Sequence, residues 1–127
     1  MYTLSIHRNF IAQHFLTVDE AGAENELHSH QYRVELLIEG EELDANGYLL
    51  DIVDLSVQFD ALIDQFRDKT LNELADFADL NPSLEHFSRI LCEKMDDALY
   101  APQVSAISIK LYEDDTAWAM YDIDRLE

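Results

Sequence analysis

The chain has 127 residues, of which 27 are Asp or Glu and only 8 are Lys or Arg, so its net charge is about −19 at pH 7. Such a charge repels phosphate backbones and anionic lipid head groups, which argues against nucleic-acid and membrane partners. Hydrophobic residues make up 48% of the chain, too many for disorder, yet they form no run long enough to span a bilayer. We therefore expect one cytoplasmic domain over residues 1–127, with the lone Cys92 as a buried apolar residue rather than a nucleophile.

Alternation of apolar and polar residues predicts two strands in the first third of the chain, because residues two apart in a strand share a face. The first predicted strand runs from Tyr2 to Leu16. An acidic, irregular segment over 17–27 predicts a loop, and the second strand follows from His28 to Glu39. A turn is expected at 44–47, where Gly47 can take a positive φ.

Apolar residues at helical spacing predict two helices after this turn. The first is expected to begin with Asp51 or Asp54 as its N-cap, and the second with Asn81 as N-cap and Pro82 in its first turn. The apolar face of the first helix comprises Leu55, Phe59, Leu62, Ile63 and Phe66. That of the second comprises Leu84, Phe87, Leu91, Met95 and Leu99.

Two more alternating segments, Val104 to Leu111 and Ala117 to Ile123, predict a third and a fourth strand. The element order is then β-β-α-α-β-β. We expect an α+β fold in which a four-stranded antiparallel sheet carries two helices on one face. Such a sheet leaves two edges and its other face uncovered, and oligomerisation is one way to protect them. An oligomer is therefore expected.

Three histidines lie where the first two predicted strands would meet. His28 and His30 are two apart in a strand, so their imidazoles lie side by side on one face. His14 lies near the end of the preceding strand and comes close to both if the strands pair antiparallel. Three histidines without an obvious fourth ligand are the pattern of a catalytic zinc ion with one open position. Paired histidines are also common on protein surfaces, so spacing alone leaves both interpretations open.

The sequence resembles one known family along nearly its whole length. Phe10-Ile-Ala-Gln-His14 and His28-Ser-His30-Gln-Tyr32 resemble the F-x-A-x-H and H-G-H-x-Y motifs of the 6-pyruvoyltetrahydropterin and 6-carboxytetrahydropterin synthases. The similarity continues in order through further segments with matching spacing. These are Gly47-Tyr-Leu-Leu-Asp51, Leu71-Asn72, Asn81-Pro82-Ser83-x-Glu85 and Leu111-Tyr-Glu113.

This resemblance implies a tetrahydropterin-synthase-type fold (T-fold), in which trimers close a barrel and commonly pair as hexamers. It implies a zinc ion held by His14, His28 and His30, and a reduced pterin such as 7,8-dihydroneopterin triphosphate as substrate. It also implies that Glu113 anchors the pterin ring, since a carboxylate can accept both parallel N–H bonds of the ring edge. The residues alone favour the simpler interpretation of Glu113 as one more acid on an acidic surface, and the anchor role depends on the resemblance.

The sequence departs from the family at the catalytic positions. Glu24 stands where the family has its cysteine, four residues before His28. In an alignment, the family's Asp-His pair falls on residues 67–68 or, after a shift of one residue, on residues 68–69. Both alignments include Asp68, and neither includes a histidine. A branch of the family has a glutamate in place of the cysteine, one position later, where Asn25 stands. Glu24 is therefore a general base, a fourth metal ligand or a solvent-facing loop residue.

The leading hypothesis is a zinc-dependent pterin lyase in which Glu24 and Asp68 handle protons and Glu113 orients the ring. The alternative is a paralogue that binds zinc and a pterin without this catalysis, because the usual cysteine and histidine are missing. A third hypothesis is a zinc hydrolase in which metal-bound water is the nucleophile.

Overall fold

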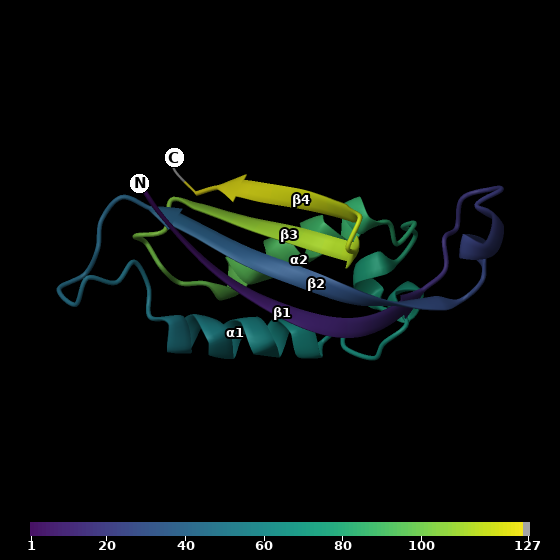
Figure 1. Ribbon diagram of the computed structural model, residues 1–127, viewed down its shortest axis with the longest axis horizontal. Helices are drawn as coiled ribbons and strands as arrows, with labels where there is room; N and C mark the ends of the chain where they lie inside the picture. The colour runs from purple at the N-terminus through teal and green to yellow at the C-terminus, as the bar shows by residue number, and fades with distance from the viewer. Residues whose placement is uncertain (126–127) are drawn as a thin grey trace.

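The computed structural model describes residues 1–125 and confirms the predicted order of strands and helices. Figure 1 shows a long twisted sheet with both helices on one of its faces. Short 3₁₀ turns lie in the connections, the first of them (η1) at Gly22–Asn25. The main elements are β1 (Tyr2–His14), β2 (His28–Gly40), α1 (Ile52–Asp64), α2 (Leu84–Ala98), β3 (Ala106–Asp114) and β4 (Ala117–Asp124).

The sheet is a four-stranded antiparallel meander with the order β1-β2-β3-β4. β1 and β2 pair without a register shift, so the last residue of β1, His14, lies opposite the first of β2, His28. β2 and β3 pair only as far as Arg33 and Tyr112. The start of β2 and the end of β3 therefore diverge at the end of the sheet that holds the histidines.

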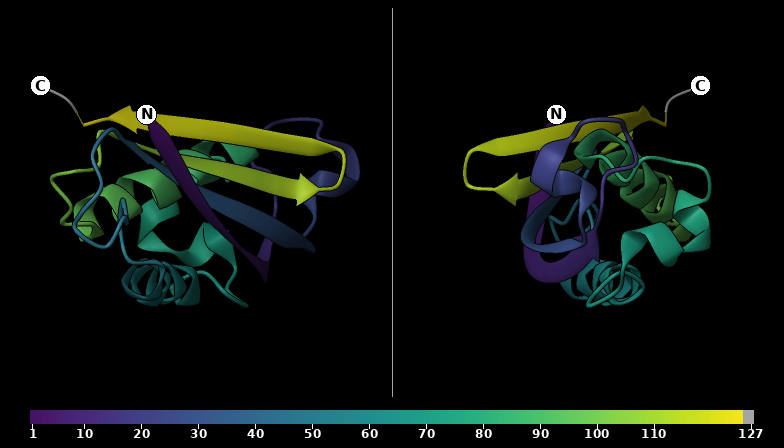
Figure 2. Two further views of the ribbon diagram at one scale, coloured as in Figure 1. Left: turned by 60° about the vertical axis from the view of Figure 1, so that its left-hand side comes forward. Right: turned by 90° about the vertical axis from the view of Figure 1, so that its right-hand side faces the viewer.

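The core lies between the sheet and the two helices, as the turned views in Figure 2 show. Along β2, every second residue from Tyr32 to Ile38 is buried on the helix side, and its neighbours are more exposed. The same alternation puts His14, His28 and His30 on the helix side, at the end of this apolar face. Cys92 is fully buried in α2, as predicted, and its burial raises the pKa of the thiol to about 12.

The helix caps agree with prediction in one case only. Asp51 caps α1 by accepting a hydrogen bond from the N–H of Val53. The N-cap of α2 is Ser83, whose hydroxyl accepts from the N–H of His86 at 3.1 Å, so the prediction of Asn81 was wrong. The Asn81 side chain is not free to cap a helix because it accepts the N–H of Thr17, at 2.8 Å, from the β1–β2 loop.

The end of the first strand was also predicted two residues too late. Phe15 and Leu16 turn their N–H groups away from the sheet, to the Asn72 side chain and to the carbonyl of Glu24. β1 therefore ends at His14, which puts this histidine at a fixed strand terminus beside the loop. Within residues 1–125, no helix combines the length and the apolar character that a membrane crossing requires.

Candidate metal centre

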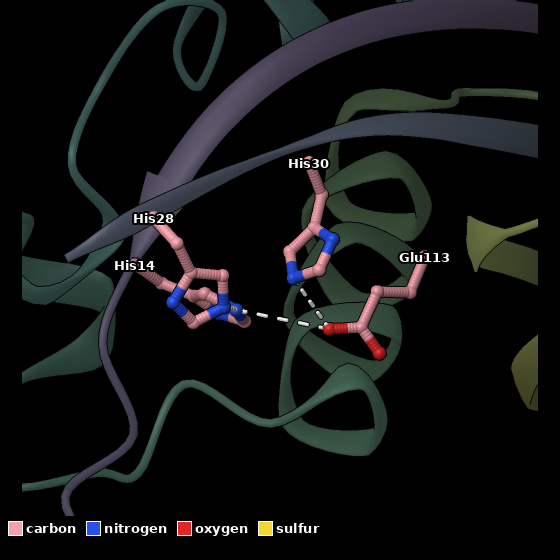
Figure 3. Close-up of side chains that lie close together, drawn as sticks. All are labelled: His14, His28, His30 and Glu113. Atoms are coloured by element: carbon pink, nitrogen blue, oxygen red, sulfur yellow. Dashed lines mark hydrogen bonds and ion pairs between the residues drawn. The ribbon is translucent and has the colours of Figure 1, made fainter. Parts of the chain in front are cut away.

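Four side chains converge at one end of the sheet, from three different strands (Figure 3). His14 comes from β1, His28 and His30 from β2, and Glu113 from β3. One ligand atom of each side chain lies within 4.8 Å of those of the other three. The structure thus places the three predicted histidines and Glu113 within reach of a single ion.

His14 is the most deeply buried member of this group, with 2% of its surface exposed. Its Nδ1 donates a hydrogen bond to the carbonyl of Pro82 at 2.9 Å, which fixes the proton on Nδ1 because a carbonyl can only accept. Burial is the main cause that lowers the pKa of His14 to about 4, and the neighbouring histidines lower it further. At neutral pH the ring is therefore neutral, and the Nε2 lone pair is available to a metal.

His28 is oriented in the same way by the loop that precedes it. Its Nδ1 donates to the carbonyl of Glu26 at 2.8 Å, so its Nε2 also carries a lone pair. The Nε2 atoms of His14 and His28 are 3.0 Å apart. Two lone pairs at this distance repel each other unless a cation lies between them. The hydrogen bonds to two backbone carbonyls thus favour metal binding at Nε2.

His30 completes the set of nitrogen donors. Its Nε2 is buried and makes no hydrogen bond among the described residues, although it lies 2.8 Å from Oε1 of Glu113. The same oxygen is 3.7 Å from Nε2 of His14. A buried nitrogen without a hydrogen bond, together with two imidazole Nε2 atoms that face each other, is a donor set that zinc accepts. The residues present therefore fit the metal that the sequence implied.

A hollow of about 450 Å³ opens beside the three-histidine group. Its lining includes His14, Glu24, Glu113, Ser83 and Trp118. Glu24 is exposed on the 3₁₀ turn η1, and its negative charge acts against the lowering of the His14 pKa. The structure therefore brings Glu24 to the same hollow as two members of the candidate metal group, His14 and Glu113.

Asp68 lies elsewhere. It is exposed, has a positive φ of 59°, and donates its N–H to the carbonyl of Ile11 at 2.7 Å on the outer edge of β1. It lines a separate hollow with Asn9, Gln31 and Arg67. Within one chain, Asp68 and the histidines do not form a common site.

The backbone carbonyls of Pro82 and Glu26 are the site groups that the sequence did not reveal. Every residue carries a carbonyl, so no residue pattern distinguishes these two. The Asn81-Pro82 motif predicts a helix start and does not by itself indicate that the Pro82 carbonyl binds His14. Its role here is to place the Pro82 carbonyl next to His14.

Three histidines that could hold a metal ion, at the end of a four-stranded sheet backed by two helices, define the class: an α+β protein with a candidate metal centre. Residues 3–124 match the family model for 6-pyruvoyl tetrahydropterin synthase, and the chain belongs to this family. The family and the T-fold predicted from the sequence are confirmed. No curated protein sequence shows significant similarity to the chain.

Solved structures of similar fold cover nearly the whole chain. A catalytic-residue variant of Plasmodium vivax 6-pyruvoyltetrahydropterin synthase has a TM-score of 0.82 at 15% identity, over 97% of this chain and 98% of that one. The Caenorhabditis elegans enzyme has a TM-score of 0.78 at 19% identity, over 94% of each chain. An uncharacterized Wolinella succinogenes protein has a TM-score of 0.72 at 17% identity, over 94% and 97%. At these identities the similarity establishes the fold.

Proposed function

We propose that the protein is a zinc-dependent, lyase-type enzyme that acts on a reduced pterin such as 7,8-dihydroneopterin triphosphate. Membership of the 6-pyruvoyl tetrahydropterin synthase family supports pterin processing as the general function. The observation that carries the zinc part is the convergence of His14, His28 and His30, two of them with Nδ1 held by a backbone carbonyl. The proposed compartment is the cytoplasm.

His14, His28 and His30 would hold the ion through Nε2. A zinc ion held there would polarise hydroxyl and carbonyl oxygens of the pterin side chain and would stabilise negative charge on them. The deep burial of His14 and its bond to Pro82 keep the donor set rigid. Rigid donors are what a catalytic metal site requires, because the substrate must meet the ion in one orientation.

Glu113 is the proposed anchor for the pterin ring. Its side chain borders two hollows, one on the helix side and one on the outer face of the sheet between β2 and β3. A carboxylate in that place can accept the two parallel N–H bonds of an amino-pyrimidinone edge.

Glu24 is the proposed general base, because it lines the hollow that also contains His14 and Glu113. One structure of similar fold is a variant of the Plasmodium vivax enzyme in which a catalytic glutamate is replaced by alanine. A glutamate with a catalytic role is therefore compatible with this fold. A carboxylate at the open side of a metal site can remove a proton when its pKa lies within reach of the working pH.

Asp68 is proposed to act across a subunit boundary. It lies beside the outer edge of β1, where its own backbone pairs with Ile11, and the rest of this edge is open to another copy. Strand directions alternate across the sheet, so an antiparallel contact between this edge and β4 of a second copy brings Asp68 near the start of that β4. The start of β4 contains Trp118, which lines the hollow beside the three-histidine group. A homotrimer or a hexamer of two trimers is the proposed assembly.

A second candidate function is a zinc- and pterin-binding protein without this catalysis. It is favoured by the absence of a cysteine at position 24 and of a histidine at 67–69. The retained histidines and Glu113 fit both candidates. Turnover decides between them.

The test is turnover of 7,8-dihydroneopterin triphosphate, or of sepiapterin, by the zinc-loaded protein, followed by chromatographic separation of the pterins. We expect multiple turnovers, and a loss of about 100-fold or more in kcat for Glu24→Gln. Glu26→Gln is the matched control, since this exposed loop residue orients His28 through its carbonyl only. Tight pterin binding without turnover would leave the second candidate, and equal rates for the two variants would remove Glu24 as the base.

A further inference from the structure

The position of Glu113 relative to the three histidines has a consequence for the metal. Donor atoms bound at about 2.0–2.1 Å to one tetrahedral zinc ion are about 3.3 Å from one another. In the structure, Oε1 of Glu113 is 2.8 Å from Nε2 of His30 and 3.7 Å from Nε2 of His14. The Nε2 atoms of His14 and His28 are 3.0 Å apart. The carboxylate oxygen therefore lies at the spacing of a fourth ligand.

The charge of the Glu113 carboxylate also favours a role as a metal ligand. The Glu113 side chain is 24% exposed, so it is largely removed from water. Among residues 1–125, no Lys or Arg forms an ion pair with it, and its only charge partners are His14 and His30. A carboxylate in this position is stabilised by a cation bound among the histidines.

We propose that Glu113 is the fourth metal ligand as long as no pterin is bound, so that the resting site is a closed centre of three nitrogens and one oxygen. The inference rests on the zinc site of the proposed function. Glu24 does not take this place, because it is exposed and lies outside the group of four ligand atoms. The sequence had left the fourth-ligand role open for Glu24 and had assigned Glu113 to the pterin alone.

The two roles of Glu113 exclude each other in time. A carboxylate that accepts two N–H bonds from a pterin ring has turned its oxygens toward the ring and away from the ion. Pterin binding therefore releases Glu113 from the metal and opens the fourth coordination position. The coordination position opens only when the substrate that needs it has arrived, so the ion is kept from unproductive ligands in the resting protein.

The test uses the full chain with zinc removed and cobalt(II) added, because visible cobalt spectra distinguish four-coordinate from higher-coordinate centres. We expect the intense bands of four-coordinate cobalt in the unaltered protein and weaker bands in Glu113→Gln. Zinc affinity, measured by competition with a chelating dye, should fall in Glu113→Gln by about 10-fold or more. Sepiapterin added to the unaltered cobalt protein should shift its spectrum, and the same addition to Glu113→Gln should not.

Two variants serve as matched controls. Glu85→Gln removes a charge from the same hollow without touching the ligand group, and should keep the zinc affinity and the spectrum. Glu24→Gln should keep both as well.

Unchanged affinity and spectrum in Glu113→Gln, or their loss in Glu24→Gln instead, would overturn the inference while the zinc site stands. If His14→Ala binds zinc as well as the unaltered protein, the zinc site itself is refuted, and the inference with it. Thermal unfolding of each metal-free variant shows whether it is folded.

Discussion

At the scale of single residues, the site depends on where protons lie. The Nδ1 protons of His14 and His28 are held by the carbonyls of Pro82 and Glu26, so both Nε2 atoms face the proposed ion. This is the usual arrangement by which outer groups set the tautomer of a metal-binding histidine. The spacing of the histidines was visible in the sequence, but their tautomers were not, because they depend on backbone groups that the fold brings to them.

Cys92 provides a test of whether any thiolate is available to replace the missing cysteine. Burial in the core raises the pKa of its thiol to about 12, from an ordinary value of 9.0. The thiolate fraction at pH 8 is then about 1,000-fold lower than in an unfolded chain. We expect iodoacetamide to alkylate Cys92 at least 100-fold more slowly in the folded protein than in denaturant, as measured by mass spectrometry. Similar rates in the two states would mean that the thiol is accessible and ionised.

At the scale of elements, the start of α2 borders the candidate metal site. Ser83 caps this helix, and the carbonyl of its neighbour Pro82 holds His14. Ser83→Ala should lower the free energy of unfolding by about 1 kcal/mol, and loosening of the Pro82 carbonyl should reduce zinc affinity several-fold. Asp51→Ala is the matched control, since it removes the cap of α1. Denaturant titrations should show a similar loss for both, and dye competition a change for Ser83→Ala only. Equal zinc affinities would mean that the cap does not support the site.

Periodicity predicted every main strand and helix because each has one buried and one exposed face, as the alternation from Tyr32 to Ile38 illustrates. The ends of elements were less predictable, because long-range contacts decide them. Asn81 has the right side chain for a cap, yet Thr17, 64 residues away, binds it. The divergence of β2 from β3 beyond Arg33 and Tyr112 had no sequence pattern either, although it opens a hollow that reaches Glu113.

At the scale of the whole molecule, the sheet has two open edges, β1 and β4. Part of the β1 edge is already occupied, because Ile11 and Gln13 bond to the backbone of Asp68 and Lys69. β4 carries Trp118, which is 53% exposed. Open edges and exposed apolar side chains are what a closed ring of copies would cover. Each copy brings a net charge of about −19, so repulsion opposes this ring and added salt should strengthen it.

The free stretch of the β1 edge allows a specific test of this assembly. Backbone groups of alternate residues point out of a sheet edge, and since those of Ile11 and Gln13 do so, that of Ser5 does too. Ser5→Pro removes an N–H that the chain's own sheet does not use but that a strand added at this edge would need. We expect sedimentation of the unaltered protein to give three or six times the mass of one chain, and of Ser5→Pro to give a single chain.

The matched control for this test is Ser5→Ala, which loses the hydroxyl and keeps the N–H, so it should remain assembled. The monomeric Ser5→Pro should still bind zinc, because all four metal-site side chains belong to one chain. Its turnover should fall if Asp68 acts from a neighbouring copy, and the fall should match that of Asp68→Asn in the assembled protein. An unaltered protein that sediments as a monomer even in about 1 M salt would contradict the ring, and with it the role proposed for Asp68. A Ser5→Pro protein that stays assembled would show that the copies meet through another surface.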